Sequence, residues 1–110
     1  MDIEELLERY RQLADLYAPA RATPGYLEDY KKSCLAMLMK DAMINGHNAV
    51  SAQEREAAAH PTYTKLLEDL RAAVLEEEKT RYHLKAVELE IEIFRTKSAN
   101  ERAERRAYGA

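Results

Sequence analysis

The three histidines and the single cysteine are the residues of this chain best suited to hold a metal ion or attack a substrate. His47, His60 and His83 are far apart in the sequence. None of them is three or four residues from another histidine or from Cys34, so no helix face would present two such ligands. Cys34 lies in the apolar run SCLAMLM and is predicted to be a small buried side chain. The sequence therefore predicts no metal site and no cofactor.

Glutamates are the second group that could do chemistry. They fill positions 76–78, and Glu88, Glu90 and Glu92 alternate with apolar residues. On a helix, successive acids point in different directions, so we expect a solvated face rather than the sheltered pair that acid–base catalysis needs. Glu77 is the exception because it falls on an apolar stripe, where a buried polar residue could fix the packing register. With no phosphate loop or nucleophile motif present, we assign no catalytic residue and do not expect an enzyme.

The C-terminal segment combines basic and aromatic residues. From position 95 onward there are five basic and two acidic residues, whereas acids outnumber bases by 18 to 12 before it. The predicted nucleic-acid-binding residues are Arg95, Lys97, Arg102, Arg105 and Arg106. Their charges would contact phosphates while Phe94 or Tyr108 stacked on bases, as in proteins that bind single strands. The alternative is a solvated helix end whose arginines are favoured by the helix dipole.

A long helix over residues 62–97 is predicted to position this segment, because glycine and proline are absent from that stretch. A set of nine mostly apolar residues follows this helix at alternating steps of four and three, a spacing that places them on one helix face. They are Leu66, Leu70, Ala73, Glu77, Thr80, Leu84, Val87, Ile91 and Phe94. At about 1.5 Å per residue the helix would be roughly 50 Å long. Ser98 and Asn100 could end it, leaving residues 98–110 as a basic tail, or start a short terminal helix.

A second apolar line on the same helix predicts self-association. Leu75, Tyr82 and Leu89 are seven residues apart, and Ile93 lies near the same side. Two apolar stripes on opposite faces indicate two neighbours, so these four residues are the predicted oligomer interface. The alternative is that the second line widens the core face of a monomer.

The preceding sequence predicts three shorter helices, over residues 2–17, 24–44 and 52–59. Asp2 would cap the first, and Pro19 would end it, with residues 18–23 as a linker. Thr23 and Pro24 form a helix start signal, and Asn45-Gly46 a stop signal. Ser51 and Glu54 match a capping box for the third helix. His60-Pro61 separates this helix from the long one.

Together these elements predict an all-α fold, a helical hairpin or bundle with one long C-terminal helix. We expect this fold to form a single domain over residues 1–110 and to be oligomeric. The net charge of −3 argues against a protein that binds nucleic acid through bulk charge. A single cysteine suits a reducing compartment. The acidic N-terminus does not resemble a secretory signal, and the longest apolar run is too short to span a bilayer. We therefore expect a cytoplasmic protein with no membrane partner.

The end of the long helix resembles small all-helical phage proteins of recombination modules. The resemblance rests on an aromatic residue, then Arg-Thr, then an Ala-Asn-rich basic tail, here Ile93-Phe94-Arg95-Thr96-Lys97-Ser98-Ala99-Asn100-Glu101-Arg102. The family is the UvsY-like recombination mediators, and the resemblance covers about a third of the chain. It implies an oligomeric helical protein that helps to load a recombinase onto single-stranded DNA coated with its binding protein.

Besides an assembly or scaffolding protein, for which self-association would be the whole function, two functions remain open from the sequence. The first is a phage-type recombination accessory protein that oligomerises and binds single-stranded DNA, a recombinase or a single-strand-binding protein. The second is a phage-encoded protein–protein interaction module that inhibits or adapts a host complex, using its acidic faces to dock on a basic partner.

Overall fold

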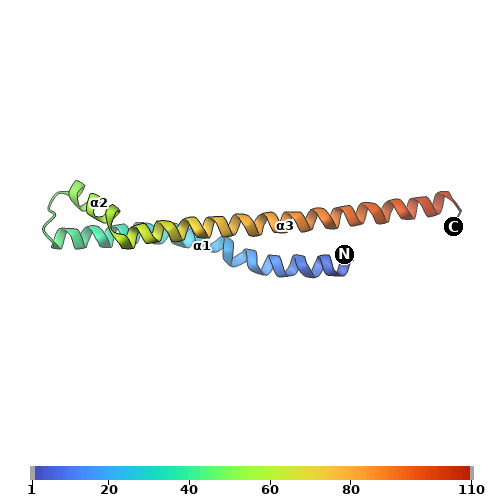
Figure 1. The fold of residues 1–110 in the computed structure, drawn as a ribbon, viewed down its shortest axis with the longest axis horizontal. Coiled ribbons are helices and arrows are strands. Elements are labelled where there is room, and N and C mark those ends of the chain that lie inside the picture. Colours follow the sequence, from blue (N-terminus) through green and yellow to red (C-terminus); the bar gives the residue numbers. More distant parts are fainter. Residues whose placement is uncertain (1, 110) are drawn as a thin grey trace. The chain divides into compact units, whose positions relative to one another are not determined.

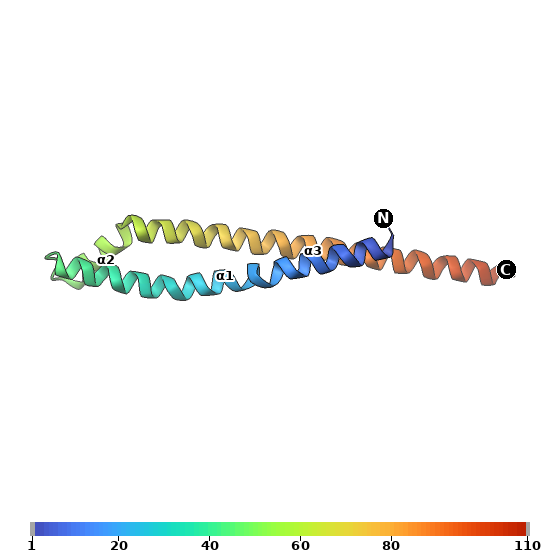
Figure 2. The same cartoon turned by 90° about the horizontal axis from the view of Figure 1, so that it is seen from below.

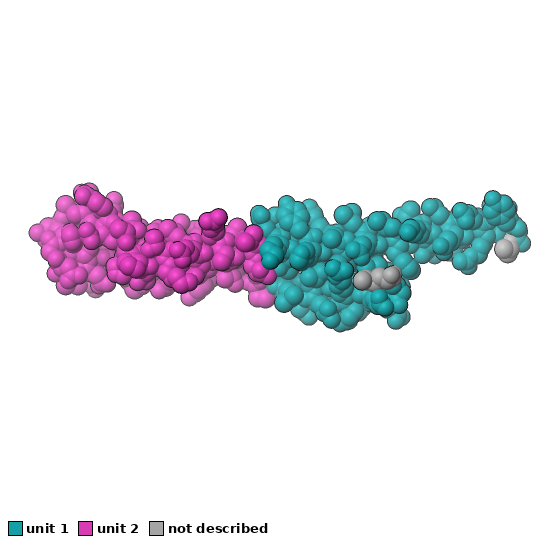
Figure 3. All heavy atoms as spheres, in the orientation of Figure 1, with its two compact units in different colours: residues 1–18, 78–110 teal, residues 19–77 magenta. Residues whose placement is uncertain are grey.

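The computed structural model describes residues 2–109, and the regular structure in that range is entirely α-helical. The helices are α1 (Ile3–Ile44), α2 (Val50–Ala59) and α3 (Pro61–Ala107), as Figure 1 shows. The predicted all-α class is confirmed. Contacts divide the chain into two compact units: unit 1 contains residues 1–18 and 78–110, and unit 2 is Pro19–Glu77 (Figure 3). Met1 and Ala110, the end residues of the predicted domain, lie outside the described residues.

Unit 2 is a helical hairpin. Its segments of α1 and α3 run antiparallel and side by side, and α2 lies at the connection between them (Figure 2). The core joins all three helices through Cys34 and Leu38 of α1, Ala57 of α2 and Leu66 of α3. Cys34 is a free thiol that is only 1% exposed, so its predicted burial is confirmed.

Unit 1 pairs the N-terminal segment of α1 with the C-terminal part of α3. Leu6 of α1 and Leu84 and Val87 of α3 are buried. The Tyr10 hydroxyl donates a hydrogen bond of 3.5 Å to Oε1 of Glu88 across this pair. The two segments therefore hold each other mainly by burial of apolar side chains, which is the dominant favourable term in such pairs.

The apolar stripe predicted for α3 is confirmed, because its nine members, from Leu66 to Phe94, are all buried or half-buried. An equivalent row follows α1 at alternating steps of three and four. In unit 1 it contains Ile3, Leu6, Tyr10, Leu13 and Tyr17, and in unit 2 Ala20, Pro24, Leu27, Lys31, Cys34 and Leu38. This heptad spacing is the pattern of coiled-coil packing.

The predicted end of the first helix at Pro19 was wrong, and so was the linker over residues 18–23. Pro19 and Pro24 both lie inside α1. A proline removes one backbone hydrogen bond and crowds the preceding turn, which usually breaks a helix. Pro24 is buried on the packed face of α1, and the Thr23 hydroxyl donates to the Pro19 carbonyl oxygen at 2.9 Å. Tertiary packing of α1 therefore outweighs the tendency of these two prolines to end the helix.

The predicted end of α1 at Asn45-Gly46 is confirmed. The amide of His47 donates to the Ala42 carbonyl at 3.0 Å, and that of Gly46 donates to the Met43 carbonyl at 3.2 Å. Gly46 has φ +105, a backbone conformation that side chains disfavour. This bond pair is the Schellman arrangement, which satisfies carbonyls that the helix end leaves free.

The capping box predicted for α2 was wrong. The helix begins at Val50, Ala49 is its N-cap without a side-chain hydrogen bond, and Ser51 lies inside it. Gln53, almost fully buried, instead fixes the entry to α2, because its Nε2 donates to the His47 carbonyl oxygen at 2.9 Å. This bond holds the preceding loop against α2 and leaves the start of the helix without a side-chain cap.

The break between α2 and α3 falls at His60-Pro61, as predicted. The Thr62 amide donates to Nδ1 of His60 at 3.1 Å, so this histidine caps the start of α3. At its other end α3 continues to Ala107 rather than stopping near Lys97. Ser98 does not end the helix; it occupies the next position of the packed stripe and is half-buried. The predicted tail is therefore mostly helical.

Candidate nucleic-acid interface

The C-terminal part of α3 is an exposed helix. Burial on the α3 stripe ends at Ser98, and every residue at positions 99–109 is exposed. The helix continues to Ala107 although no other segment of unit 1 buries it there. Arg105 and Arg106 lie in its last turn, where positive charge interacts favourably with the helix dipole. The segment therefore presents its side chains to solvent from a regular scaffold.

Three of the five predicted basic residues share one face of this helix. At about 100° per residue, Arg95, Arg102 and Arg106 fall within an arc of about 40°. We call these three residues the arginine face. Along the axis they are separated by about 10 Å and about 6 Å. Arg105 lies about 80° to one side, and Lys97 lies about 160° away, on the side of Glu101 and Glu104. The helix thus separates Lys97 from the group to which the sequence analysis assigned it.

Arg95 is the one member of the arginine face with an ion-pair partner within the described residues. Its Nη1 lies 3.1 Å from Oε1 of Glu92, and these two side chains are 71% and 66% exposed. Such exposed pairs contribute little, about 0 to 1 kcal/mol, so a phosphate could displace the glutamate. Ala99 lies between Arg95 and Arg102, and all three line a shallow surface hollow. The small side chain leaves room for a ligand between the two guanidinium groups.

Phe94, one of the two predicted stacking residues, lines the same hollow as Arg95 and Arg102. It is half-buried, because it occupies a position of the packed stripe. Tyr108 is 86% exposed and remains a possible stacking partner. The sequence could have shown that Phe94 is partly buried, because it continues the helical spacing of the stripe residues Val87 and Ile91.

The second apolar line is exposed. Leu75 in unit 2, and Tyr82, Leu89 and Ile93 in unit 1, are between 55% and 65% exposed. The alternative that they widen the core face of a monomer was wrong. The guanidinium carbon of Arg81 lies 5.1 Å from the centre of the Tyr82 ring, which leaves most of this ring uncovered. These side chains have the exposure that an oligomer interface requires, and their role stays a prediction.

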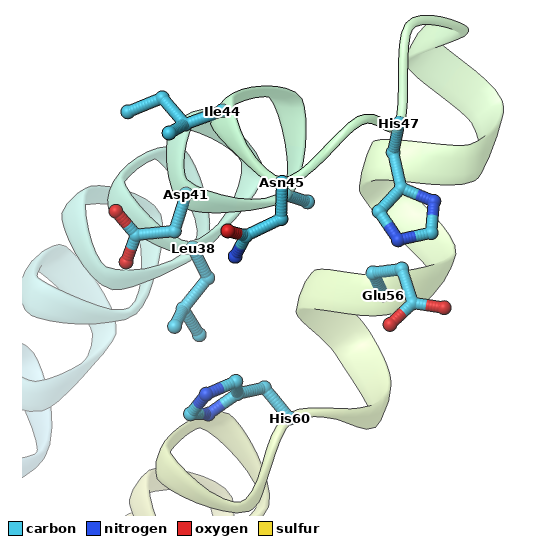
Figure 4. A pocket seen from close by; sticks show the side chains of 8 residues that line it. Leu38, Asp41, Ile44, Asn45, His47, Glu56 and His60 are labelled. Atoms are coloured by element: carbon cyan, nitrogen blue, oxygen red, sulfur yellow. The ribbon is translucent and has the colours of Figure 1, made fainter.

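A hollow of about 300 Å³ in unit 2 lies where α1, α2 and α3 meet (Figure 4). His47 and His60 both line it, together with Asp41 and Glu56, although these two histidines are thirteen residues apart in the sequence. No group of three or more histidine, cysteine or acidic residues in positions 2–109 is placed to hold a metal ion. His60 caps the start of α3 by accepting the Thr62 amide, and this structural role explains its place beside the hollow.

The acidic residues lie on solvent-exposed faces, with Glu77 the half-buried exception on the stripe. Glu88 accepts a hydrogen bond from the Tyr10 hydroxyl, and Glu78 lies 3.6 Å from the Arg81 guanidinium. Neither arrangement is the sheltered carboxylate pair of an acid–base catalyst.

No family model, curated protein or solved structure matches this chain. Within residues 2–109, none of the helices combines the length and the hydropathy that crossing a bilayer demands.

Proposed function

We propose that this protein is a helical recombination accessory protein that self-associates and binds single-stranded DNA through the arginine face. One observation carries the proposal: the exposed side chains of Arg95, Arg102 and Arg106 are aligned on one face of α3 in a chain of net negative charge. Guanidinium groups pair readily with phosphates, and a row of them follows a flexible single strand.

Self-association belongs to this proposal because one arginine face is a weak binding site. A few phosphate contacts give modest affinity at physiological salt, since each contact must displace counterions. Several linked copies raise the effective concentration of each further contact and can raise the overall affinity by 10²–10⁴. The exposed residues Tyr82, Leu89 and Ile93 on the same helix supply a means of linkage. A recombinase or a single-strand-binding protein would be the natural protein partner of such a complex.

The test compares two triple variants that change net charge equally. The first carries R95E, R102E and R106E, and the second carries R9E, R21E and R55E, all at exposed positions. Binding to a fluorescent single-stranded oligonucleotide is measured by anisotropy at several salt concentrations. We expect the first variant to lose binding and the second to retain most of it. For wild-type protein we expect log Kd to rise with log salt with a slope of about 2 per copy, from three contacts. Equal loss in both variants would show that only net charge matters and would refute the arginine face.

A protein–protein interaction module is the second candidate, and a separate observation favours it. In unit 2, Tyr26 and Tyr30 stack with their rings 6.3 Å apart, and Tyr26 is 67% exposed. Met37 on the same helix is 52% exposed. Exposed tyrosines and methionines are typical of protein-binding surfaces. A pull-down from nuclease-treated host lysate distinguishes the two functions: a partner retained by wild-type protein and lost on Y26A/Y30A substitution would favour this module.

A further inference from the structure

The outer face of α3 in unit 1 carries a second heptad repeat. Its first row consists of residues seven apart, which are Lys79, Ala86, Ile93 and Asn100. Its second row follows three positions later and consists of Tyr82, Leu89, Thr96 and Ala103. All eight residues are exposed. We call these two rows the outer seam; they lie two positions after the packed stripe and hence on the opposite side of the helix.

The polar residues beside the outer seam follow a fixed order. Glu78, Lys85 and Glu92 directly precede the first row, and His83, Glu90 and Lys97 directly follow the second. In a parallel, in-register coiled coil, each residue of the first set faces the residue five positions later in the other copy. Glu78 would then face His83, Lys85 would face Glu90, and Glu92 would face Lys97. The second and third contacts join opposite charges, the first joins a glutamate to a histidine, and the pattern is self-complementary.

Two further features agree with a parallel pair. Among the described residues, neither Lys85 nor Glu90 forms an ion pair within its own chain, so both charges are available to a second copy. Asn100 occupies a first-row position, where asparagine fixes register in parallel coiled coils by meeting its own counterpart. A pair that ran antiparallel over residues 82–93 would separate the two Asn100 side chains.

We infer that the outer seam binds a second copy of this chain, parallel and in register. The inference rests on the self-association in the proposed function and specifies its partner, orientation and register. Arg95 and Arg102 lie away from the seam, so each copy would present them on an outer side of the pair, whereas Arg106 lies fourteen residues after Glu92 and therefore beside the seam. Two parallel arginine faces at the same end would then be available to one strand.

Disulfide trapping tests the orientation. Ala103 is in the outer seam, and Glu101, two residues earlier, points to roughly the opposite side; both are exposed. The A103C and E101C variants are oxidised in a glutathione buffer and followed on non-reducing gels. The buried thiol of Cys34 gives the background, measured on wild-type protein. We expect A103C to form a covalent dimer at least ten times faster than E101C.

Equal rates for the two variants, or no dimer from A103C, would overturn the inference. Circular dichroism of both reduced variants checks that α3 is intact, which exposed substitutions should not affect. Oligonucleotide binding by reduced wild-type protein is measured alongside, and this separates the two proposals. A crosslinked A103C dimer with no DNA binding would refute the proposed function and leave the pairing intact. DNA binding without the selective crosslink would refute the pairing alone.

Discussion

Replacing the two prolines inside α1 should stabilise the protein by different amounts. Proline costs about 3 kcal/mol relative to alanine in a helix interior, because it lacks the amide donor and crowds the preceding turn. Pro19 is exposed, so P19A should recover most of this cost and lose little packing. We therefore expect P19A to raise the free energy of unfolding by about 2 to 3 kcal/mol.

Pro24 differs because its ring is buried. Changing it to alanine removes two methylene groups from the packed face, at about 0.8 kcal/mol each. This loss of about 1.6 kcal/mol offsets about half of the gain of about 3 kcal/mol from the restored helix. The expected net stabilisation for P24A is about 1 to 1.5 kcal/mol, clearly smaller than for P19A.

Urea unfolding followed by circular dichroism measures both changes. Protein concentration must be equal in all samples, because self-association would add to apparent stability. At m-values of about 1–3 kcal/mol/M, P19A should move the midpoint by about 1 M or more. The reasoning fails if P24A stabilises more than P19A, since burial would then not determine the difference. It also fails if P19A destabilises, because the helix would then depend on its proline.

Two other substitutions test the outer face and the end of α1. L89E places a charge in the exposed apolar line and should abolish self-association. The control L16E, at a leucine of similar exposure on α1, should leave self-association unchanged. Light scattering measures the mass in solution, and an unchanged mass for L89E would show that Leu89 is not part of the interface. G46A should lower the free energy of unfolding by about 1 kcal/mol, because alanine disfavours the positive φ that the helix end requires. Nothing lies within 4 Å of the added methyl group, so a loss above about 3 kcal/mol would contradict a purely backbone cause.

The two proposals depend on different surfaces of one helix. The arginine face is charged and would bind with strong salt dependence, whereas the outer seam is partly apolar and should tolerate salt better. This difference allows each surface to be altered without loss of the other.

Much of the fold follows from local sequence. The alternating steps of four and three on α3 identify its packed face, because helical periodicity makes side chains at that spacing neighbours. Asn45-Gly46 and His60-Pro61 mark helix ends for equally local reasons: a glycine at positive φ and a proline without an amide donor. The exposure of Tyr82, Leu89 and Ile93 also follows from their offset relative to that face.

Tertiary structure decided the features in which packing opposes local preference. Pro19 and Pro24 remain inside α1 because the helix is held along its packed face on both sides of them. Ser98 continues α3 because it occupies the next position of the stripe. At the start of α2 no side chain caps the helix, and Gln53 holds the loop by donating to the His47 carbonyl oxygen. Local propensities differ by about 1 kcal/mol per residue or less for most residues, so burial of a few side chains is enough to override them. The sequence by itself determined the all-α class and the packed face of α3, because both follow from helical periodicity. Contacts between distant residues decided that α1 continues through its two prolines and that α3 extends to Ala107.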